Sequence, residues 1–126
     1  MKATVLIVDD SKLARIVAGK AIATLQPDWE RIEASNADQA LELARSRDVH
    51  AMVIDYNMAG KNGIELGQEV RALYPTLPIA IITANVQDEI IAASRAIGAT
   101  FVSKPVTSDG LRDFLKRIEE SLRGGT

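Results

Sequence analysis

The residues of this sequence best suited to chemistry are three aspartates, a threonine and a lysine that follow apolar segments. Asp9 and Asp10 end the first such segment. Asp55, Thr83 and Lys104 end three later ones. Carboxylates brought together repel one another by about 4 kcal/mol per pair at about 4 Å, in a medium of effective dielectric near 20. A cluster of the three aspartates must therefore take up protons, pair with cations or bind a metal ion.

The charge balance of these residues favours a hard divalent cation. Lys104 supplies one positive charge against three carboxylates, so two negative charges are left to neutralise. Mg²⁺ fits, because it typically binds one or two carboxylates together with water and phosphate oxygens. One carboxylate at the edge of the site, Asp55, could then attack a phosphoryl group. The cation and Lys104 would offset charge on the transferring oxygens, and Thr83 could donate a hydrogen bond to them.

Short apolar segments that alternate with helical patterns must position these residues. Strands are expected at Thr4–Val8, Trp29–Ala34, Ala51–Ile54, Pro78–Ile82 and Thr100–Ser103, and helices at Ser11–Leu25, Asn36–Arg45, Gly63–Leu73, Asp88–Ile97 and Ser108–Arg123. Five successive β-α units predict a parallel sheet with right-handed crossovers and helices on both faces. We expect a doubly wound α/β fold, (βα)5, with strand order 2-1-3-4-5, the flavodoxin-like arrangement. This order gathers the polar residues at the carboxyl edge, where such folds bind ligands.

Local patterns support the first two helices. The first carries an apolar stripe that is expected to face the core, formed by Leu13, Ile16, Val17, Ala21 and Leu25. Either Ser11 or Asp10 can cap its start, because both residue types accept hydrogen bonds from the first turn. In the second helix, Asn36 and Gln39 have the spacing of a capping box.

Composition excludes several classes of protein. The 126 residues fit one domain, contain no cysteine and include a single histidine, His50, so disulfides, thiolate sites and multi-histidine metal sites are excluded. The net charge of −2, with both signs interspersed, argues against binding to nucleic acid or to an anionic membrane. The apolar runs are far shorter than the roughly 20 residues of a membrane span. We expect a cytoplasmic protein.

Taken in order, these residues resemble the receiver domain of two-component response regulators, over essentially the whole chain. The matches are the acid pair Asp9-Asp10, the phosphoacceptor Asp55, the hydroxyl position Thr83, the switch aromatic Phe101 and the pair Lys104-Pro105. Any one match would be weak evidence, but five in this order are specific. The resemblance implies a single receiver domain over residues 1–126, of the stand-alone CheY-like type, which acts as a signalling switch rather than as an enzyme.

The resemblance also implies a role for each residue. Asp9 and Asp10 would hold Mg²⁺ with help from Asp55 and the backbone carbonyl of Asn57. Asp55 would take a phosphoryl group, and Lys104 would pair with one of its oxygens. Further implied features are the movement of Thr83 toward the phosphoryl group, the rotation of Phe101 into the vacated space, and a cis bond between Lys104 and Pro105.

The implied partners lie on both sides of this reaction. A sensor histidine kinase, a phosphotransfer protein or a small donor such as acetyl phosphate would supply the phosphoryl group. The surface formed by Asp88–Ile97, Thr100–Ser103 and Ser108–Arg123 would bind an unidentified downstream protein. The resemblance suggests a monomer or weak dimer with slow autodephosphorylation, and no direct contact with nucleic acid or membrane.

The sequence departs from the family pattern in the phosphoacceptor loop and at the switch position. Ala59 stands where the family usually has proline, so a residue that would stiffen the loop is missing. Phe101 stands in place of the usual tyrosine, so any role of the tyrosine hydroxyl is lost. Asn57 and Asn85 occupy positions that vary in the family and border the path of the attacking water, where they would influence the lifetime of the phosphorylated state.

Two other classes of function use the same architecture. A nucleotide or flavin binder needs a glycine-rich or hydroxyl-rich phosphate loop after the first strand, but here the acidic Asp9-Asp10 follows that strand. A haloacid-dehalogenase-type phosphatase would have two aspartates spaced two residues apart there. A receiver-like interaction module that has lost its chemistry would lack an acid, the acceptor or the lysine, and none of these is missing.

Overall fold

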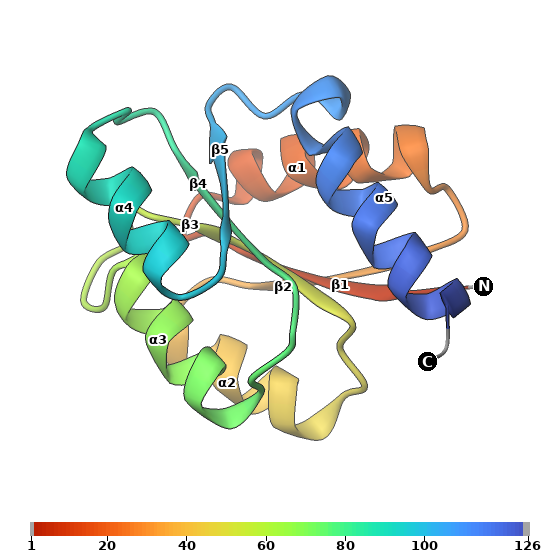
Figure 1. The fold of residues 1–126 in the computed structure, drawn as a ribbon, viewed down its shortest axis with the longest axis horizontal. Coiled ribbons are helices and arrows are strands. Elements are labelled where there is room, and N and C mark those ends of the chain that lie inside the picture. The colour runs from red at the N-terminus through yellow and green to blue at the C-terminus, as the bar shows by residue number, and fades with distance from the viewer. Residues whose placement is uncertain (1, 125–126) are drawn as a thin grey trace.

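The computed structural model describes residues 2–124 and contains all ten expected elements in the expected order (Figure 1). The strands are β1 (Thr4–Val8), β2 (Glu30–Ala34), β3 (Ala51–Asp55), β4 (Ile79–Thr83) and β5 (Thr100–Ser103), and the helices are α1 (Lys12–Leu25), α2 (Ala37–Ser46), α3 (Gly63–Leu73), α4 (Asp88–Ala96) and α5 (Ser108–Gly124). The prediction ended two strands one residue early. Asp55 and Thr83 are themselves the last residues of β3 and β4, because both remain paired with neighbouring strands.

The five strands form one parallel sheet in the order β2-β1-β3-β4-β5, which confirms the predicted topology. The register aligns the carboxyl ends of the central strands, since Val8 pairs with Ile54, and Asp55 with Ile82. The order reverses between β1 and β3, so the loops after these two strands open into the same crevice. Asp9 and Asp55 therefore follow paired residues and lie at adjacent positions on the carboxyl edge.

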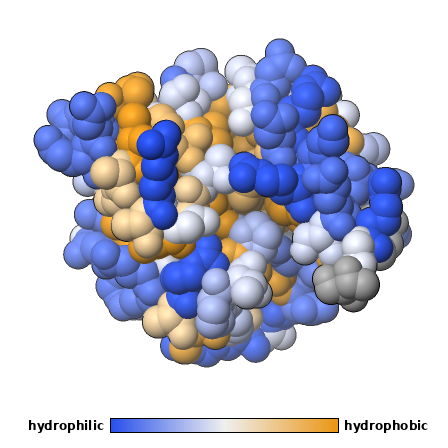
Figure 2. Space-filling model, in the orientation of Figure 1, coloured by the Kyte–Doolittle hydropathy of each residue, from blue (hydrophilic) through white to orange (hydrophobic). Residues whose placement is uncertain are grey.

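The side chains of the three central strands, β1, β3 and β4, alternate between two apolar layers, as expected for strands that are buried on both faces. One layer packs β-strand residues such as Val53 against α1 and α5. The other packs residues such as Ile54 against α2 and α3, with α4 at its margin. Figure 1 shows α1 and α5 together on one side of the sheet and the remaining helices on the other. In the face shown in Figure 2, hydrophilic residues cover most of the surface.

The predicted apolar stripe of α1 is wrong in its first two turns. Leu13 is 71% exposed, and Ile16 and Val17 are also exposed. The rest of the stripe is confirmed, because Ala21 is buried and Leu25 packs against the core, and the helix also buries Ala18 and Ile22. The difference is one of position, because the first turns of α1 lie beside an open cleft at the carboxyl edge, where Leu13 and Val17 form part of the wall.

Capping interactions fix where the helices begin. Ser11, rather than Asp10, caps α1, and its hydroxyl accepts a hydrogen bond from Ala14 N–H at 3.2 Å. Asn36 caps α2, but the predicted reciprocal bond is absent within the described chain, because the Gln39 side chain accepts from the backbone of Ser35 instead. The complete capping box is at α3.

At α3, Asn62 accepts from Glu65 N–H at 2.9 Å, and the Glu65 side chain accepts from Asn62 N–H at 2.8 Å. Directly after this cap, Gly63 lies so close to β3 that an added Cβ would stand 2.5 Å from the Asp55 carbonyl oxygen. Together these features fix the end of the loop that follows Asp55.

Candidate phosphoacceptor site

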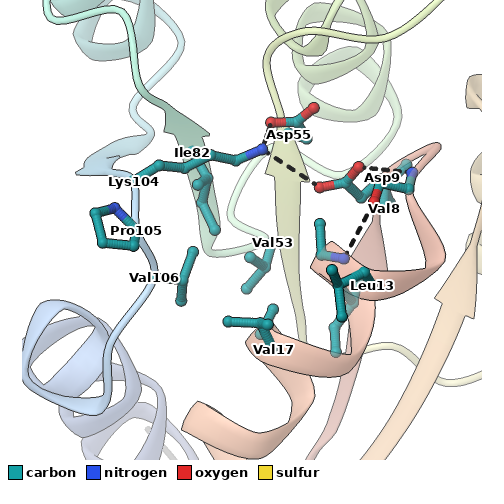
Figure 3. A pocket seen from close by; sticks show the side chains of 14 residues that line it. Val8, Asp9, Leu13, Val17, Val53, Asp55, Ile82, Lys104, Pro105 and Val106 are labelled. Carbon is teal, nitrogen blue, oxygen red and sulfur yellow. Dashed lines mark hydrogen bonds and ion pairs between the residues drawn. The ribbon is translucent and has the colours of Figure 1, made fainter.

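Asp55 is a buried carboxylate at the centre of the carboxyl edge. Its side chain is 4% exposed, and its Oδ1 lies 2.9 Å from Nζ of Lys104. The position follows from strand alternation, because Asp55 points to the same face of the sheet as Val53, toward α1 and α5. Lys104 has the same parity as Val102 on β5 and reaches back over the sheet to meet it (Figure 3).

Asp9 is the second buried carboxylate. Its Oδ1 accepts a hydrogen bond from Ser11 N–H at 2.9 Å, and its Oδ2 lies 3.7 Å from Nζ of Lys104. The lysine therefore stands between two carboxylates, as the dashed lines in Figure 3 show. Its ammonium group is the cation that pairs with both of them.

Asp10 completes the acidic group from a more exposed position. Its Oδ2 accepts a hydrogen bond from Ala59 N–H at 3.3 Å, in the loop between β3 and α3. One oxygen from each of Asp9, Asp10 and Asp55 lies within 4.8 Å of the others. Asn57 is exposed in the same loop.

The electrostatics of the site favour a bound cation. Burial raises the pKa of Asp55 above its usual value, and the charges of Asp9 and Asp10 raise it further, although Lys104 opposes them. Burial acts to lower the pKa of Lys104, but its hydrogen bonding and attraction to Asp55 and Asp9 raise that pKa overall. One lysine does not balance three carboxylates. Oxygen ligands that converge with excess negative charge are what a hard divalent cation requires, so the residues present fit Mg²⁺.

A cleft of about 260 Å³ adjoins the ion pairs. Figure 3 shows Asp9, Asp55 and Lys104 at one end of it. Its apolar wall consists of residues from α1, the sheet and the segment after β5, including Leu13, Val17, Val53, Ile82, Pro105 and Val106. The cleft therefore extends from the ion pairs along α1, which forms part of its wall. The wall residues on α1 were not identified from the sequence, because their spacing also suits an ordinary core stripe.

Thr83 occupies a different place from the carboxylates. It is fully buried, and its Oγ1 accepts a hydrogen bond from Asn85 N–H at 2.9 Å. It has the parity of Ile81, which belongs to the layer on the α2 and α3 side, and it is not among the described residues that line the cleft. Phe101 pairs with Ile81 and is partly exposed.

The remaining predicted residues border the same edge. The peptide bond between Lys104 and Pro105 is cis. Lys104 N–H donates to the carbonyl of Thr83 at 3.0 Å, so the segment that carries the lysine is joined to the end of β4. Asn85 is exposed in the loop after β4.

Comparison with known proteins identifies the family. The model of the response regulator receiver domain matches residues 5–116. The chain belongs to this family. It is 32% identical over 123 residues to the chemotaxis protein CheY of Pseudomonas aeruginosa, and the match covers 95% of this chain and 98% of that protein. The structure of the Vibrio cholerae chemotaxis protein CheY4 superposes with a TM-score of 0.82 at 28% identity, and the match covers 94% of this chain and 99% of that one.

A receiver domain also occurs within larger proteins. The chain is 33% identical over 110 residues to a cyclic di-GMP phosphodiesterase of Thermotoga maritima. That match covers 86% of this chain but spans only 29% of the phosphodiesterase. What the two share is therefore the receiver domain, a signalling domain with an acidic pocket. None of the helices in residues 2–124 is long and apolar enough to cross a membrane.

Proposed function

We propose that this receiver domain is a phosphorylation switch in a two-component phosphorelay, and that Asp55 accepts the phosphoryl group in a Mg²⁺-dependent reaction. The observation that carries the proposal is the buried Asp55 carboxylate, 2.9 Å from Lys104 and clustered with two further carboxylates. The phosphoryl donor would be a sensor histidine kinase, a phosphotransfer protein or a small acyl phosphate.

The cation would be held by the carboxylates of Asp9, Asp10 and Asp55 and by the backbone carbonyl of Asn57. When bound, Mg²⁺ would offset the negative charge of the transferring phosphoryl oxygens. Asp9 is suited to this role because Ser11 N–H fixes its orientation. This set contains only oxygen ligands, the type that Mg²⁺ prefers.

In the transfer step, an oxygen of Asp55 forms a bond to phosphorus while the bond from phosphorus to the leaving nitrogen or oxygen of the donor breaks. Lys104 would move from its ion pair with Asp55 to a phosphoryl oxygen, since the carboxylate of Asp55 loses its own charge when it is phosphorylated. The Thr83 hydroxyl, whose oxygen accepts from Asn85 in this structure, keeps its proton to donate to the phosphoryl group.

The output would come from the surface of α4, β5 and α5. Movement of Thr83 would free space for Phe101, which pairs with Ile81 on the adjacent strand. A change in these two residues would alter the surface that a downstream protein binds. We propose that the domain signals in the cytoplasm as a monomer or weak dimer, through protein partners rather than nucleic acid or membrane.

Water attack on phosphorus would reverse the switch slowly, and Asn57 and Asn85, which are both exposed, would influence the rate of this attack. We propose residues 1–126 as one receiver domain that assists its own phosphorylation and dephosphorylation and is not an enzyme acting on other substrates. The phosphodiesterase activity of the Thermotoga relative is not proposed, because this chain matches only 29% of that protein.

The proposal is tested by incubating the protein with acetyl phosphate and Mg²⁺ and measuring its intact mass. The wild type should gain one phosphoryl group only when Mg²⁺ is present, and Asp55→Asn should gain none. A wild type that stays unmodified with both acetyl phosphate and a histidine-phosphorylated donor would contradict the proposal.

A further inference from the structure

Asp10 is the most exposed of the three clustered carboxylates, and it is fixed differently from the other two. Asp9 is 6% exposed and is oriented by Ser11 N–H, in its own loop. Asp55 is 4% exposed and is paired with Lys104. Asp10 has neither a partner in its own loop nor an ion pair within residues 2–124. Its orientation must depend on another part of the chain.

That part is the backbone of Ala59. The Ala59 N–H donates to Asp10 Oδ2 at 3.3 Å, and it is the one hydrogen bond to this side chain within the described chain. Ala59 lies two residues after Asn57, whose carbonyl is a proposed cation ligand. The bond therefore connects the two loops that would lie on either side of the cation, and it leaves Asp10 Oδ1 available.

Repulsion among the carboxylates makes this bond important for the orientation of Asp10 when no cation is bound. Asp9 and Asp55 repel Asp10, because all three carboxylates converge within 4.8 Å. An exposed side chain can relieve such repulsion by rotating toward water. The N–H of Ala59, with its positive end directed at Oδ2, opposes that rotation.

The donor itself is held in place by the rest of its loop. Gly63 N–H donates to the carbonyl of Tyr56 at 2.9 Å, which closes the loop at its base. Nζ of Lys61 lies 2.5 Å from an oxygen of Glu69 on α3. Ala59 lies between these two attachments, so its N–H is presented from a loop that is anchored on both sides.

We propose that the Ala59 N–H is a positioning group that holds Asp10 in reach of a divalent cation before the cation binds. This inference rests on the proposed function for its cation. It concerns a property of this sequence, because a proline at position 59, as expected from the family resemblance, would have no N–H to donate.

Amide hydrogen exchange in EDTA tests the bond without any cation or phosphoryl donor. The exchange of Ala59 should be at least about threefold faster in Asp10→Ala than in the wild type, and that of Gly63, the control amide, should not change. Asp10→Asn removes the charge but keeps a carbonyl acceptor, so its Ala59 exchange should stay closer to that of the wild type. Equal Ala59 exchange in wild type and Asp10→Ala would overturn the proposal.

Mg²⁺ titration of the unphosphorylated protein tests the consequence. Ala59→Pro should raise the Kd for Mg²⁺ by about 2- to 10-fold, the range expected for loss of one modest hydrogen bond. The matched control Ala59→Ser keeps the N–H and should change the Kd by less than about twofold. If Ala59→Pro binds Mg²⁺ with a Kd equal to or lower than that of the wild type, this inference alone is overturned. If the wild type binds no Mg²⁺, the proposed function is contradicted.

Discussion

Replacement of Asp55 by asparagine should stabilise the metal-free protein near neutral pH. Burial and the neighbouring aspartates raise the pKa of Asp55, so the folded state binds a proton on this group more tightly than the unfolded state does. Ionisation therefore costs folding free energy. The cost is absent below the unfolded pKa and complete above the folded one. Asp55→Asn removes it, so the advantage of the variant should shrink as the pH falls through the folded pKa.

The size of the effect follows from the distances in the cluster. At the 4.8 Å limit that contains the three carboxylates, each of Asp9 and Asp10 repels Asp55 by about 3.5 kcal/mol at an effective dielectric near 20. Lys104, at 2.9 Å, attracts it by about 6 kcal/mol in the same medium. The repulsions exceed the attraction by about 1 kcal/mol. Lost hydration of the buried carboxylate adds to this, so we expect a stabilisation of about 1–3 kcal/mol.

The assay is urea unfolding in EDTA, followed by circular dichroism, near pH 7 and near pH 4. Asp28→Asn, in an exposed loop, is the matched control and should change the free energy of unfolding by less than about 0.5 kcal/mol. Saturating Mg²⁺ should reduce the difference in free energy of unfolding between the wild type and Asp55→Asn. The cation stabilises the folded state that binds it, and the wild type has one more carboxylate for it. The reasoning is refuted if Asp55→Asn is no more stable than the wild type near pH 7. It is also refuted if the stability advantage of Asp55→Asn is as large near pH 4 as near pH 7.

Three further substitutions test other parts of the site. Lys104→Met should lower the rate of phosphorylation by acetyl phosphate by at least about 100-fold, and a rate within tenfold of the wild type would contradict this. The same substitution should destabilise the fold by about 1–3 kcal/mol, because it leaves the buried Asp55 carboxylate unpaired. Gly63→Ala should lower the free energy of unfolding in urea by about 3 kcal/mol, because the added Cβ would collide with the backbone of β3. The loss should be larger than for Gly60→Ala, where only the positive φ of 77° opposes the substitution. Asn62→Ala should cost about 1 kcal/mol through loss of the α3 cap, and an unchanged unfolding midpoint would show that this cap contributes nothing.

The sequence predicted the place of the carboxylates because strand ends are set by two strong signals. An apolar run that stops at an aspartate marks the end of a buried strand, and parallel topology brings those ends to one edge. The alternation of side chains along each strand then decides which face of the sheet each side chain is on. Asp55 shares the parity of Val53, and Thr83 shares that of Ile81, so the two side chains leave opposite faces of the sheet. This difference could have been read from the sequence by counting positions along each strand.

Other features depend on tertiary position and could not be predicted from the sequence in the same way. Leu13 and Val17 have the spacing of a core stripe, and only the position of the first turns of α1 beside the cleft makes these two residues part of its wall. The Gln39 side chain accepts a hydrogen bond from the backbone of Ser35, the residue before the cap, which the capping-box spacing does not indicate. The bond from Ala59 to Asp10 joins residues 49 positions apart through a backbone donor, which no residue type signals.

The most direct test of the central claim is to locate the phosphoryl group. Protein treated with acetyl phosphate and Mg²⁺ is reduced with borohydride, which converts a phosphorylated aspartate to homoserine, and is then digested and sequenced by mass spectrometry. We predict homoserine at position 55 and intact aspartate at positions 9 and 10. Homoserine at position 9 or 10, or a phosphorylated protein in which Asp55 is unchanged, would contradict the account.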